Sequence, residues 1–265
     1  MPDWFLSAQP GYARVAPASD GSFTPVAAFS TRAGGVSPPP FDSLNLSEGV
    51  GDDPRAVREN RRRLLEALGH DADRVAYATQ VHGAHVLLPG GPGLAGNGDA
   101  LVARAAGLGI VVGTADCLGL LAWDRSGRGV AAVHAGWRGI VAGVVERTLE
   151  SLSQHGIAPS ELEVALGPRI GPCCFEVGAD VAIRLKDAAL TGPNGRTTVD
   201  LARAVRRRLE AGGVWPGSVR GLDECTSCGT GSWYSHRRDR GRTGRLWAIA
   251  ILKRAGGRDA RETAV

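Results

Sequence analysis

The sequence predicts one α/β domain spanning residues 1–265. Short apolar runs that are typical of strands alternate with longer segments in which apolar residues recur every three or four positions, as in amphipathic helices. No internal repeat or break in composition divides the 265 residues, and this length is enough for a sizeable core. Apolar residues make up 43% of the chain and charged residues 22%, which excludes disorder and fibrous repeats as descriptions of the whole chain.

In the first half of the chain, a strand and a capped helix are expected first. Asp53 and Pro54 predict a helix start, because Asp accepts hydrogen bonds from free N–H groups and Pro suits the first helical position. This helix is expected to end at about Gly69. Long loops are predicted at 33–42, which has three consecutive prolines, and at 89–98, which has five glycines. Strands are expected at 24–30, 75–79, 85–88 and 109–114.

In the second half, two strands joined by a tight turn are expected, followed by alternating helices and strands. The turn-forming residues 124–127 would join the first two strands. A helix is predicted from about Gly139 to His155, since its apolar residues are spaced by three or four. Asp200 is expected to cap another helix. The strands are predicted at 118–123, 129–134, 162–166 and 246–252.

Composition and charge disfavour several classes of protein. The net charge is only +4, so we expect no nucleic-acid partner. No run reaches about 18 apolar residues, so no membrane-spanning helix or membrane partner is expected. The N-terminus lacks a basic region followed by an apolar run, and the five cysteines are an odd number, so we expect a cytoplasmic protein. The oligomeric state is left open.

Three chemically active residues, His82, Cys117 and His134, each lie at the end of a short apolar run. The ends of strands are where α/β folds assemble their sites. One thiolate and two imidazoles would hold Zn²⁺ and leave a fourth position open, which is typical of a catalytic zinc site. Each histidine taken alone is better explained as a polar residue near the core, but their equivalent positions make the two interpretations comparable.

The segment after His134 indicates a second kind of site. Gly136 and Gly139 flank a predicted strand-to-helix turn, and Arg138 lies between them. The start of a helix exposes N–H groups and partial positive charge, so an anion such as phosphate would bind there. The alternative is that the two glycines only permit a tight turn.

The other four cysteines form two pairs in the sequence. Cys173 and Cys174 are adjacent, and vicinal cysteines are more often packed thiols. Cys225 and Cys228 have the spacing of half a zinc site or of a redox pair. Because the chain has no second Cys-x-x-Cys, we do not expect a four-cysteine zinc site and interpret all four as thiols. His236 is interpreted as a surface or packing residue, and the basic run 237–245 as a solvated loop or an anion contact.

Taken together, eight motifs in one order resemble the YfiH-type laccase-domain family of purine nucleoside phosphorylases. The resemblance extends over about residues 25–250, and eight motifs in register are more specific than any one of them. The family often has an aromatic pair before its Ser-x-Arg-Arg-Asp motif, where this chain has Trp233 and Tyr234, and His236 stands where the family often has an aromatic residue. The motifs are FSTRAGGVS (29–37), SLNL (43–46), VGDDP (50–54), TQVHG (79–83), ADC (115–117), VHAGWRG (133–139), LGPRIG (166–171) and YSHRRD (234–239).

The resemblance implies both a fold and an activity. The implied fold is a layered sandwich with mixed β-sheets and flanking helices. The family's zinc ligands, matched motif by motif, fall on His82, Cys117 and His134. The implied activity is phosphorolysis of adenosine, inosine and 5′-methylthioadenosine, with deamination of adenosine. The family's older label is multicopper polyphenol oxidase, and some members have been linked to the editing of peptidoglycan precursors.

The composition disfavours the oxidase activity. Two histidines and a cysteine also match the ligands of blue-copper sites, but the usual axial Met is missing, because Met1 is the only methionine. A trinuclear copper cluster needs many histidines, commonly in His-x-His pairs, whereas this chain has six histidines and no such pair. Zinc is therefore the expected metal, and copper is disfavoured.

A nucleoside phosphorylase makes better use of the residues present. Arg32, Arg138 and Arg169 are predicted to hold inorganic phosphate, while Asn45 and Gln80 are predicted to hydrogen-bond ribose or base. The His-x-Glu and Pro-Cys-x-x-Cys signatures of known zinc deaminases are missing, so any deamination must use a different site.

A cysteine hydrolase is the alternative enzyme class. Cys117 and His134 would form a thiolate–imidazolium pair that hydrolyses an amide, as peptidoglycan editing requires. Cys117 would then be a nucleophile rather than a ligand, and the activity would survive a chelator. A third possibility is a non-catalytic partner protein with a vestigial site, which the intact triad argues against.

Overall fold

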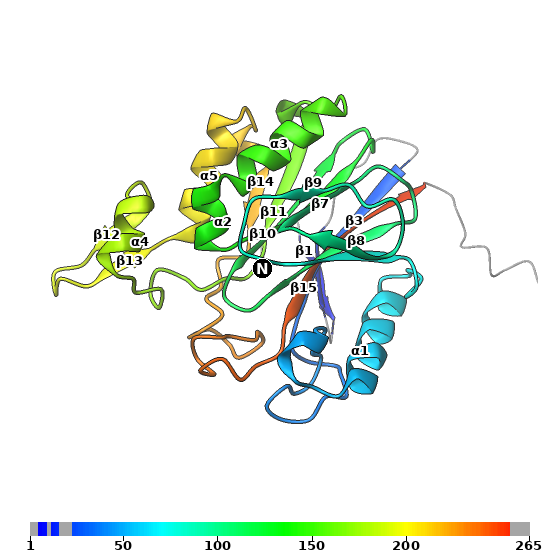
Figure 1. The fold of residues 1–265 in the computed structure, drawn as a ribbon, viewed down its shortest axis with the longest axis horizontal. Helices are drawn as coiled ribbons and strands as arrows, with labels where there is room; N and C mark the ends of the chain where they lie inside the picture. Colours follow the sequence, from blue (N-terminus) through cyan, green and yellow to red (C-terminus); the bar gives the residue numbers. More distant parts are fainter. Residues whose placement is uncertain (1–4, 10–11, 16–22, 255–265) are drawn as a thin grey trace, which may run out of the picture.

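The computed structural model describes residues 5–9, 12–15 and 23–254, which form a layered α/β sandwich (Figure 1). Two mixed sheets face each other, with helices on both outer faces. The seven-stranded sheet has the order β1 (Phe5–Gln9), β2 (Tyr12–Val15), β3 (Phe23–Ser30), β15 (Leu246–Arg254), β8 (Gly109–Thr114), β4 (Val75–Thr79) and β6 (Gly93–Asn97). The six-stranded sheet has the order β14 (Val219–Gly221), β11 (Leu162–Leu166), β9 (Leu118–Asp124), β10 (Val130–Ala135), β7 (Ala100–Ala103) and β5 (Val86–Leu87). The predicted fold class is therefore confirmed.

The central strands of both sheets are buried on both faces, and the alternation of side chains explains the layers. In β15, Ile249 and Ile251 pack toward helix α1 (Pro54–Ala67), whereas Ala248, Ala250 and Leu252 pack between the sheets. Successive residues of a strand point to opposite faces, so a sheet covered on both sides needs apolar residues at every position. Strands β9, β10 and β11 accordingly are buried along their whole length.

The helices cover the outer faces, and one of them differs from its prediction. Asp53 and Asp200 cap α1 and α5 (Leu201–Ala211) as expected. The single helix predicted over 139–155 is instead two helices, α2 (Trp137–Ala142) and α3 (Val144–Gln154). Gly143 separates them, since its φ of 88° is left-handed and ends α2. Short 3-10 helices span η1 (Glu48–Val50), η2 (Pro159–Glu161) and η3 (Pro216–Ser218).

The sequence predicted that the glycine-rich stretch 89–98 is a loop, but part of it forms a strand. Its residues 93–97 form β6, which pairs in parallel with β4 at the edge of the seven-stranded sheet. The hydrogen bonds between β6 and β4 join backbone groups, so a segment can add to the edge of the sheet even when its side chains do not alternate between apolar and polar. The stretch 33–42 contains no helix or strand, as expected.

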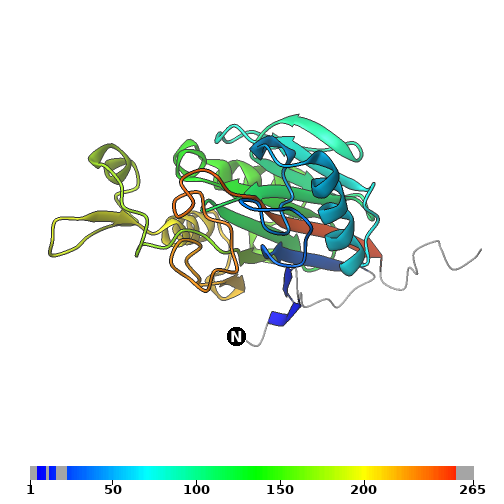
Figure 2. The same ribbon diagram turned by 90° about the horizontal axis from the view of Figure 1, so that it is seen from below.

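A small unit projects from one end of the sandwich, and the sequence did not predict it. It consists of α4 (Ala179–Arg184) and the antiparallel pair β12 (Ala189–Thr191) and β13 (Thr197–Val199). Figures 1 and 2 both show it lying beyond the edge of the main sheets. Among the described residues, no helix is both long and apolar enough to cross a membrane.

Candidate metal centre and its cavity

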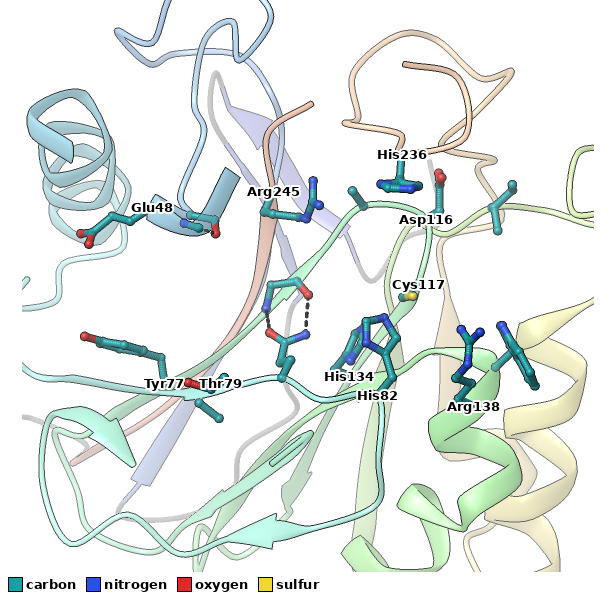
Figure 3. A pocket seen from close by; sticks show the side chains of 18 of the residues that line it. Glu48, Tyr77, Thr79, His82, Asp116, Cys117, His134, Arg138, His236 and Arg245 are labelled. Carbon is teal, nitrogen blue, oxygen red and sulfur yellow. Dashed lines mark hydrogen bonds between the residues drawn. The ribbon is translucent and has the colours of Figure 1, made fainter. Parts of the chain in front are cut away.

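The fold gathers His82, Cys117 and His134 at one point between the two sheets. His82 follows β4, Cys117 lies in the turn from β8 to β9, and His134 is near the end of β10. One ligand atom from each residue lies within 4.8 Å of the other two. The two imidazole rings meet edge to face, with centroids 4.8 Å apart (Figure 3). The sheets thus supply one potential metal site from three distant segments.

Asp99, which sequence reasoning missed, orients two of these three residues. Its fully buried carboxylate accepts the backbone N–H groups of Val81, His82 and Gly83 at 3.2, 2.9 and 2.7 Å. It also lies 2.8 Å from Nδ1 of His134. A carboxylate accepts hydrogen bonds, so Nδ1 carries the proton and Nε2 is left as the nitrogen that can bind a metal. The same bonds hold His82 at its left-handed φ of 58°.

The turn that presents Cys117 is equally well anchored. Asp116 has a left-handed φ of 83°, and its carboxylate accepts the Thr226 hydroxyl and the Arg237 N–H, each at 2.6 Å. Gly136 faces the sulfur, and a Cβ there would stand 3.0 Å from Cys117 Sγ. Glycine at this position therefore leaves room beside the sulfur, which any larger side chain would fill.

The charges of Cys117 and His134 stabilise each other. Burial raises the pKa of the Cys117 thiol, but the charges and hydrogen bonds of His134 and His82 outweigh it and lower this pKa to about 6. Burial also lowers the pKa of His134, but the Cys117 thiolate and the hydrogen bond to Asp99 raise it to about 9. Without a metal, the pair is a thiolate and an imidazolium near pH 7. A metal ion that enters the site therefore meets the Cys117 sulfur already as a thiolate, which is the form that binds metal ions.

The three residues open onto a cavity of about 860 Å³, which is large enough for a small-molecule substrate. Its walls combine aromatic rings with positively charged side chains. In Figure 3, Arg138 lies beside the triad, Arg245 and His236 lie on the opposite wall, and Tyr77 and Glu48 are farther away. The aromatic residues are Tyr77, Trp137 and Phe175, and the arginines are Arg61, Arg138, Arg237 and Arg245.

Two of the predicted substrate-binding residues line this cavity. Arg138 is exposed, and its guanidinium stacks on the Trp137 ring at 4.4 Å. Gln80 lines it too, but its amide bonds the backbone of Gly113 in both directions, at 2.8 and 2.6 Å (Figure 3). Gln80 thereby ties the end of β4 to β8. The predicted helix start at Gly139 is wrong, because α2 already begins at Trp137.

Three other predicted residues do not line the cavity and have partners within the protein. Arg32 pairs with Asp42 at 2.8 Å. Arg169 is buried, and its guanidinium donates to the carbonyl of Leu222 at 2.6 Å. The buried Asn45 accepts the backbone N–H of Arg245 at 2.9 Å, so it positions a cavity residue without lining the cavity itself. The structure does not bring these three side chains to the metal centre.

Sequence reasoning also missed two further arginines that line the cavity. Arg237 and Arg245 flank the basic run that was interpreted as a solvated loop or an anion contact, and both line the cavity. Position in the sequence did not reveal this, because the run begins more than 100 residues after both His82 and His134. The signal available was the run of positive charge directly before a buried strand.

The class defined by this fold and site is a mixed α/β sandwich in which a His/Cys/His cluster opens onto a cavity lined by aromatic rings and arginines. Residues 26–253 match the family model described as multi-copper polyphenol oxidoreductase laccase, and the chain belongs to this family. It is 44% identical over 235 residues to the purine nucleoside phosphorylase of Deinococcus radiodurans, covering 87% of this chain and 90% of that protein.

Further relatives agree in sequence and in structure. The chain is 41% identical over 233 residues to the purine nucleoside phosphorylase YfiH of Escherichia coli, covering 85% of this chain and 93% of that protein. The crystal structure of YlmD from Geobacillus stearothermophilus superimposes with a TM-score of 0.88 at 35% identity, covering 95% of this chain and 100% of that one. The resemblance seen in the motifs is therefore confirmed.

Proposed function

We propose that this protein is a zinc-dependent purine nucleoside phosphorylase. Its substrates would be inorganic phosphate and adenosine, inosine or 5′-methylthioadenosine, and it would also deaminate adenosine. The observation that carries the proposal is the His82/Cys117/His134 cluster opening onto a cavity with four arginines and three aromatic rings. The relatives named purine nucleoside phosphorylases support it. The five cysteines, none of which forms a disulfide, support a reducing, cytoplasmic location.

The donor set of the cluster fits zinc. It offers one thiolate and two imidazoles with ligand atoms within 4.8 Å of one another, and Asp99 fixes the orientation of His134. Three protein ligands leave a fourth position open, as in catalytic zinc sites. When bound, zinc would supply Lewis-acid polarisation of a substrate oxygen. Four of the chain's six histidines lie outside this cluster, so the residues do not fit a multicopper centre.

Arg138 is the residue that we propose to hold phosphate. It is exposed beside the triad, and no carboxylate of the described residues pairs with it, so its N–H groups are available. Its stacking on Trp137 fixes the plane of the guanidinium. Arg237 and Arg245 add further positive charge to the cavity. Negative charge on phosphate is thus held near the position where the glycosidic bond would break.

The aromatic residues of the cavity would bind the purine. The Trp137 ring stacks on Arg138, the Phe175 ring lies 5.7 Å from the Arg237 guanidinium, and Tyr77 lies farther from the triad (Figure 3). A planar base gains both apolar contact and ring stacking from such side chains. Gln80 and Asn45 act through Gly113 and Arg245, so we assign them to positioning the walls rather than to direct contact with the nucleoside.

A cysteine hydrolase is the second candidate, and the thiolate–imidazolium pair favours it. With a pKa of about 6, the Cys117 sulfur is ionised at neutral pH, which a nucleophilic cysteine requires. This function predicts hydrolysis of an amide in a peptidoglycan precursor that persists after the metal is removed. The phosphorylase predicts the opposite dependence on metal.

The decisive experiment measures release of free base from the three nucleosides by protein of known metal content. We expect release that needs both phosphate and bound zinc, and that His82→Ala abolishes. His85→Ala is the matched control, because His85 is also exposed but its side chain does not line the cavity. If protein with one zinc in the cluster releases no base, the phosphorylase proposal is wrong. Chelator-resistant amide hydrolysis would then favour the alternative.

A further inference from the structure

Four cysteines form a second cluster away from the candidate metal centre. Cys173, Cys174, Cys225 and Cys228 place their sulfurs within 4.8 Å of one another, and the sulfurs of Cys173 and Cys228 are 3.5 Å apart. None of them is in a disulfide. The sequence interpretation that a four-cysteine site could not form is wrong, because the vicinal pair takes the place of a second Cys-x-x-Cys.

The topology of the six-stranded sheet explains how the two pairs meet. Strands β11 and β14 are parallel neighbours, with Val164 opposite Val219, so the loops that follow them leave the same end of the sheet. The loop after β11 carries the vicinal pair, and the loop after β14 carries the spaced pair. The two loops also pair through a short bridge between Arg169 and Cys225. The cysteines are therefore brought together by the fold and not by chance contact of flexible segments.

The backbone around Cys225 has the arrangement of a metal-bound thiolate. Its sulfur accepts the N–H of Gly171 at 3.2 Å, and the N–H groups of Ser227 and Cys228 also point to it. A neutral thiol is a weak acceptor, so three N–H groups directed at one sulfur favour the charged form. The Thr226 N–H in turn donates to the carbonyl of Arg169 at 2.9 Å, which holds the turn against the neighbouring loop.

We propose that Cys173, Cys174, Cys225 and Cys228 bind one Zn²⁺ ion in a closed, structural site. Zinc–sulfur bonds of about 2.3 Å place tetrahedral sulfurs roughly 3.8 Å apart, close to the spacing in the cluster. Four protein ligands leave no position open for substrate, unlike the three-ligand centre at His82. Both pairs lie at or near the surface, where a metal can enter. The function of this zinc is to tie the loop 167–178 to the loop 222–245.

The tied loops form one wall of the cavity. Phe175, which follows Cys174 directly, lines the cavity, and Arg237 donates to the Cys174 carbonyl at 3.1 Å. Thr226, inside the Cys-x-x-Cys turn, donates to Asp116 at 2.6 Å, next to Cys117. The zinc would therefore hold a wall of the substrate cavity in place without touching substrate.

Metal analysis of purified, reduced protein tests this site independently of activity. We expect two zinc ions per chain in the unaltered protein. Cys228→Ser should lose one and keep the ion at His82, while His82→Ala should lose the other. Ser227→Ala is the matched control, because it lies inside the same turn, retains its backbone N–H, and should keep both ions.

A second measurement covers the case in which Cys228→Ser fails to fold. In the His82→Ala variant, which retains only the four-cysteine site, a mercurial reagent that titrates thiols should release the remaining zinc. Substitution with Co²⁺ in the His82→Ala background should give the strong thiolate-to-metal absorption of a four-sulfur site. The proposal is overturned if the unaltered protein holds one zinc and His82→Ala removes it. It is equally overturned if the four cysteines hold iron, or if air-free protein has them as disulfides.

Discussion

The two cysteine-containing clusters of this protein differ in the number of their ligands and in their access to the cavity, as expected for a catalytic and a structural metal site. At the His82 centre, three ligands come from strand ends in two sheets, and the buried Asp99 orients His134 from behind. At the four-cysteine cluster, all ligands come from loops and the supporting groups are backbone N–H groups. With a metal bound, the first site would leave a coordination position facing the cavity, whereas the proposed second site would close around its ion. Ligand number and access to the cavity, rather than the presence of thiolate, distinguish the two.

Removing Cys117 should have the largest effect on activity. We expect Cys117→Ser to lower kcat/KM for phosphorolysis at least about 100-fold, because Lewis-acid stabilisation is worth several kcal/mol. Cys228→Ser, measured below its melting temperature, should keep its activity within about tenfold, since its site is structural. Steady-state kinetics of the two variants checks this. Equal losses in both would remove the distinction between the sites.

The zinc-free centre should react with alkylating agents in a pH-dependent way. Since the pKa of Cys117 is lowered from 9.0 to about 6, its sulfur is ionised above about pH 6 and protonated below. Alkylation of Cys117 by iodoacetamide, followed by peptide mass spectrometry, should have a midpoint near pH 6, and zinc should block it. A midpoint near 9 would show that His134 does not stabilise the thiolate.

Asp99 should control metal affinity at the first centre. Asp99→Asn keeps the size of the side chain but replaces one acceptor oxygen by an amide NH₂, which cannot accept the N–H groups that the carboxylate binds. We expect zinc affinity to fall about 10- to 100-fold, as for other groups that orient metal ligands. Competition with a zinc indicator measures it. Asp73→Asn, at an exposed carboxylate, should change nothing, and an equal loss there would contradict the role of Asp99.

Arg138 should act on phosphate more than on nucleoside. We expect Arg138→Ala to raise the KM for phosphate about tenfold, since a hydrogen bond to a charged group is worth about 1.5–3 kcal/mol and this side chain is exposed. The KM for inosine should change less. Arg147→Ala, at an exposed arginine of α3, is the control. A rise only in the nucleoside KM would assign Arg138 to the base instead.

At the four-cysteine cluster, the effect should be on thermal stability rather than on activity. A metal that binds only the folded chain stabilises it by mass action, by about 3–4 kcal/mol when free zinc is about 100 to 1,000 times its Kd. For a chain of this size we expect Cys228→Ser to lower Tm by roughly 5–10 °C. Differential scanning calorimetry with and without added zinc measures it. A Tm that is unchanged by the substitution would argue against a structural metal.

Much of the architecture could be predicted from local sequence. Asp53 and Asp200 mark helix starts because a short polar side chain can cap free N–H groups wherever the chain leads next. The mostly apolar runs 118–123 and 162–166 predict strands, and both form buried strands. The positions of His82, Cys117 and His134 at strand ends made a shared site a reasonable hypothesis. These features depend on neighbours in the chain, which the sequence displays directly.

The tertiary structure decided which distant groups meet. Gly143 breaks a helix whose apolar spacing looked continuous, and β6 forms from a glycine-rich segment because a strand edge was available. Arg32 and Arg169 found partners inside the protein, whereas Arg237 and Arg245 came to line the cavity. Ion pairing, hydrogen bonding and metal binding act over a few ångströms in space, and spacing along the chain does not report such distances. The sequence by itself therefore determined the elements and the kinds of side chain at their ends, and only the packing of two sheets and their loops determined which of them form sites.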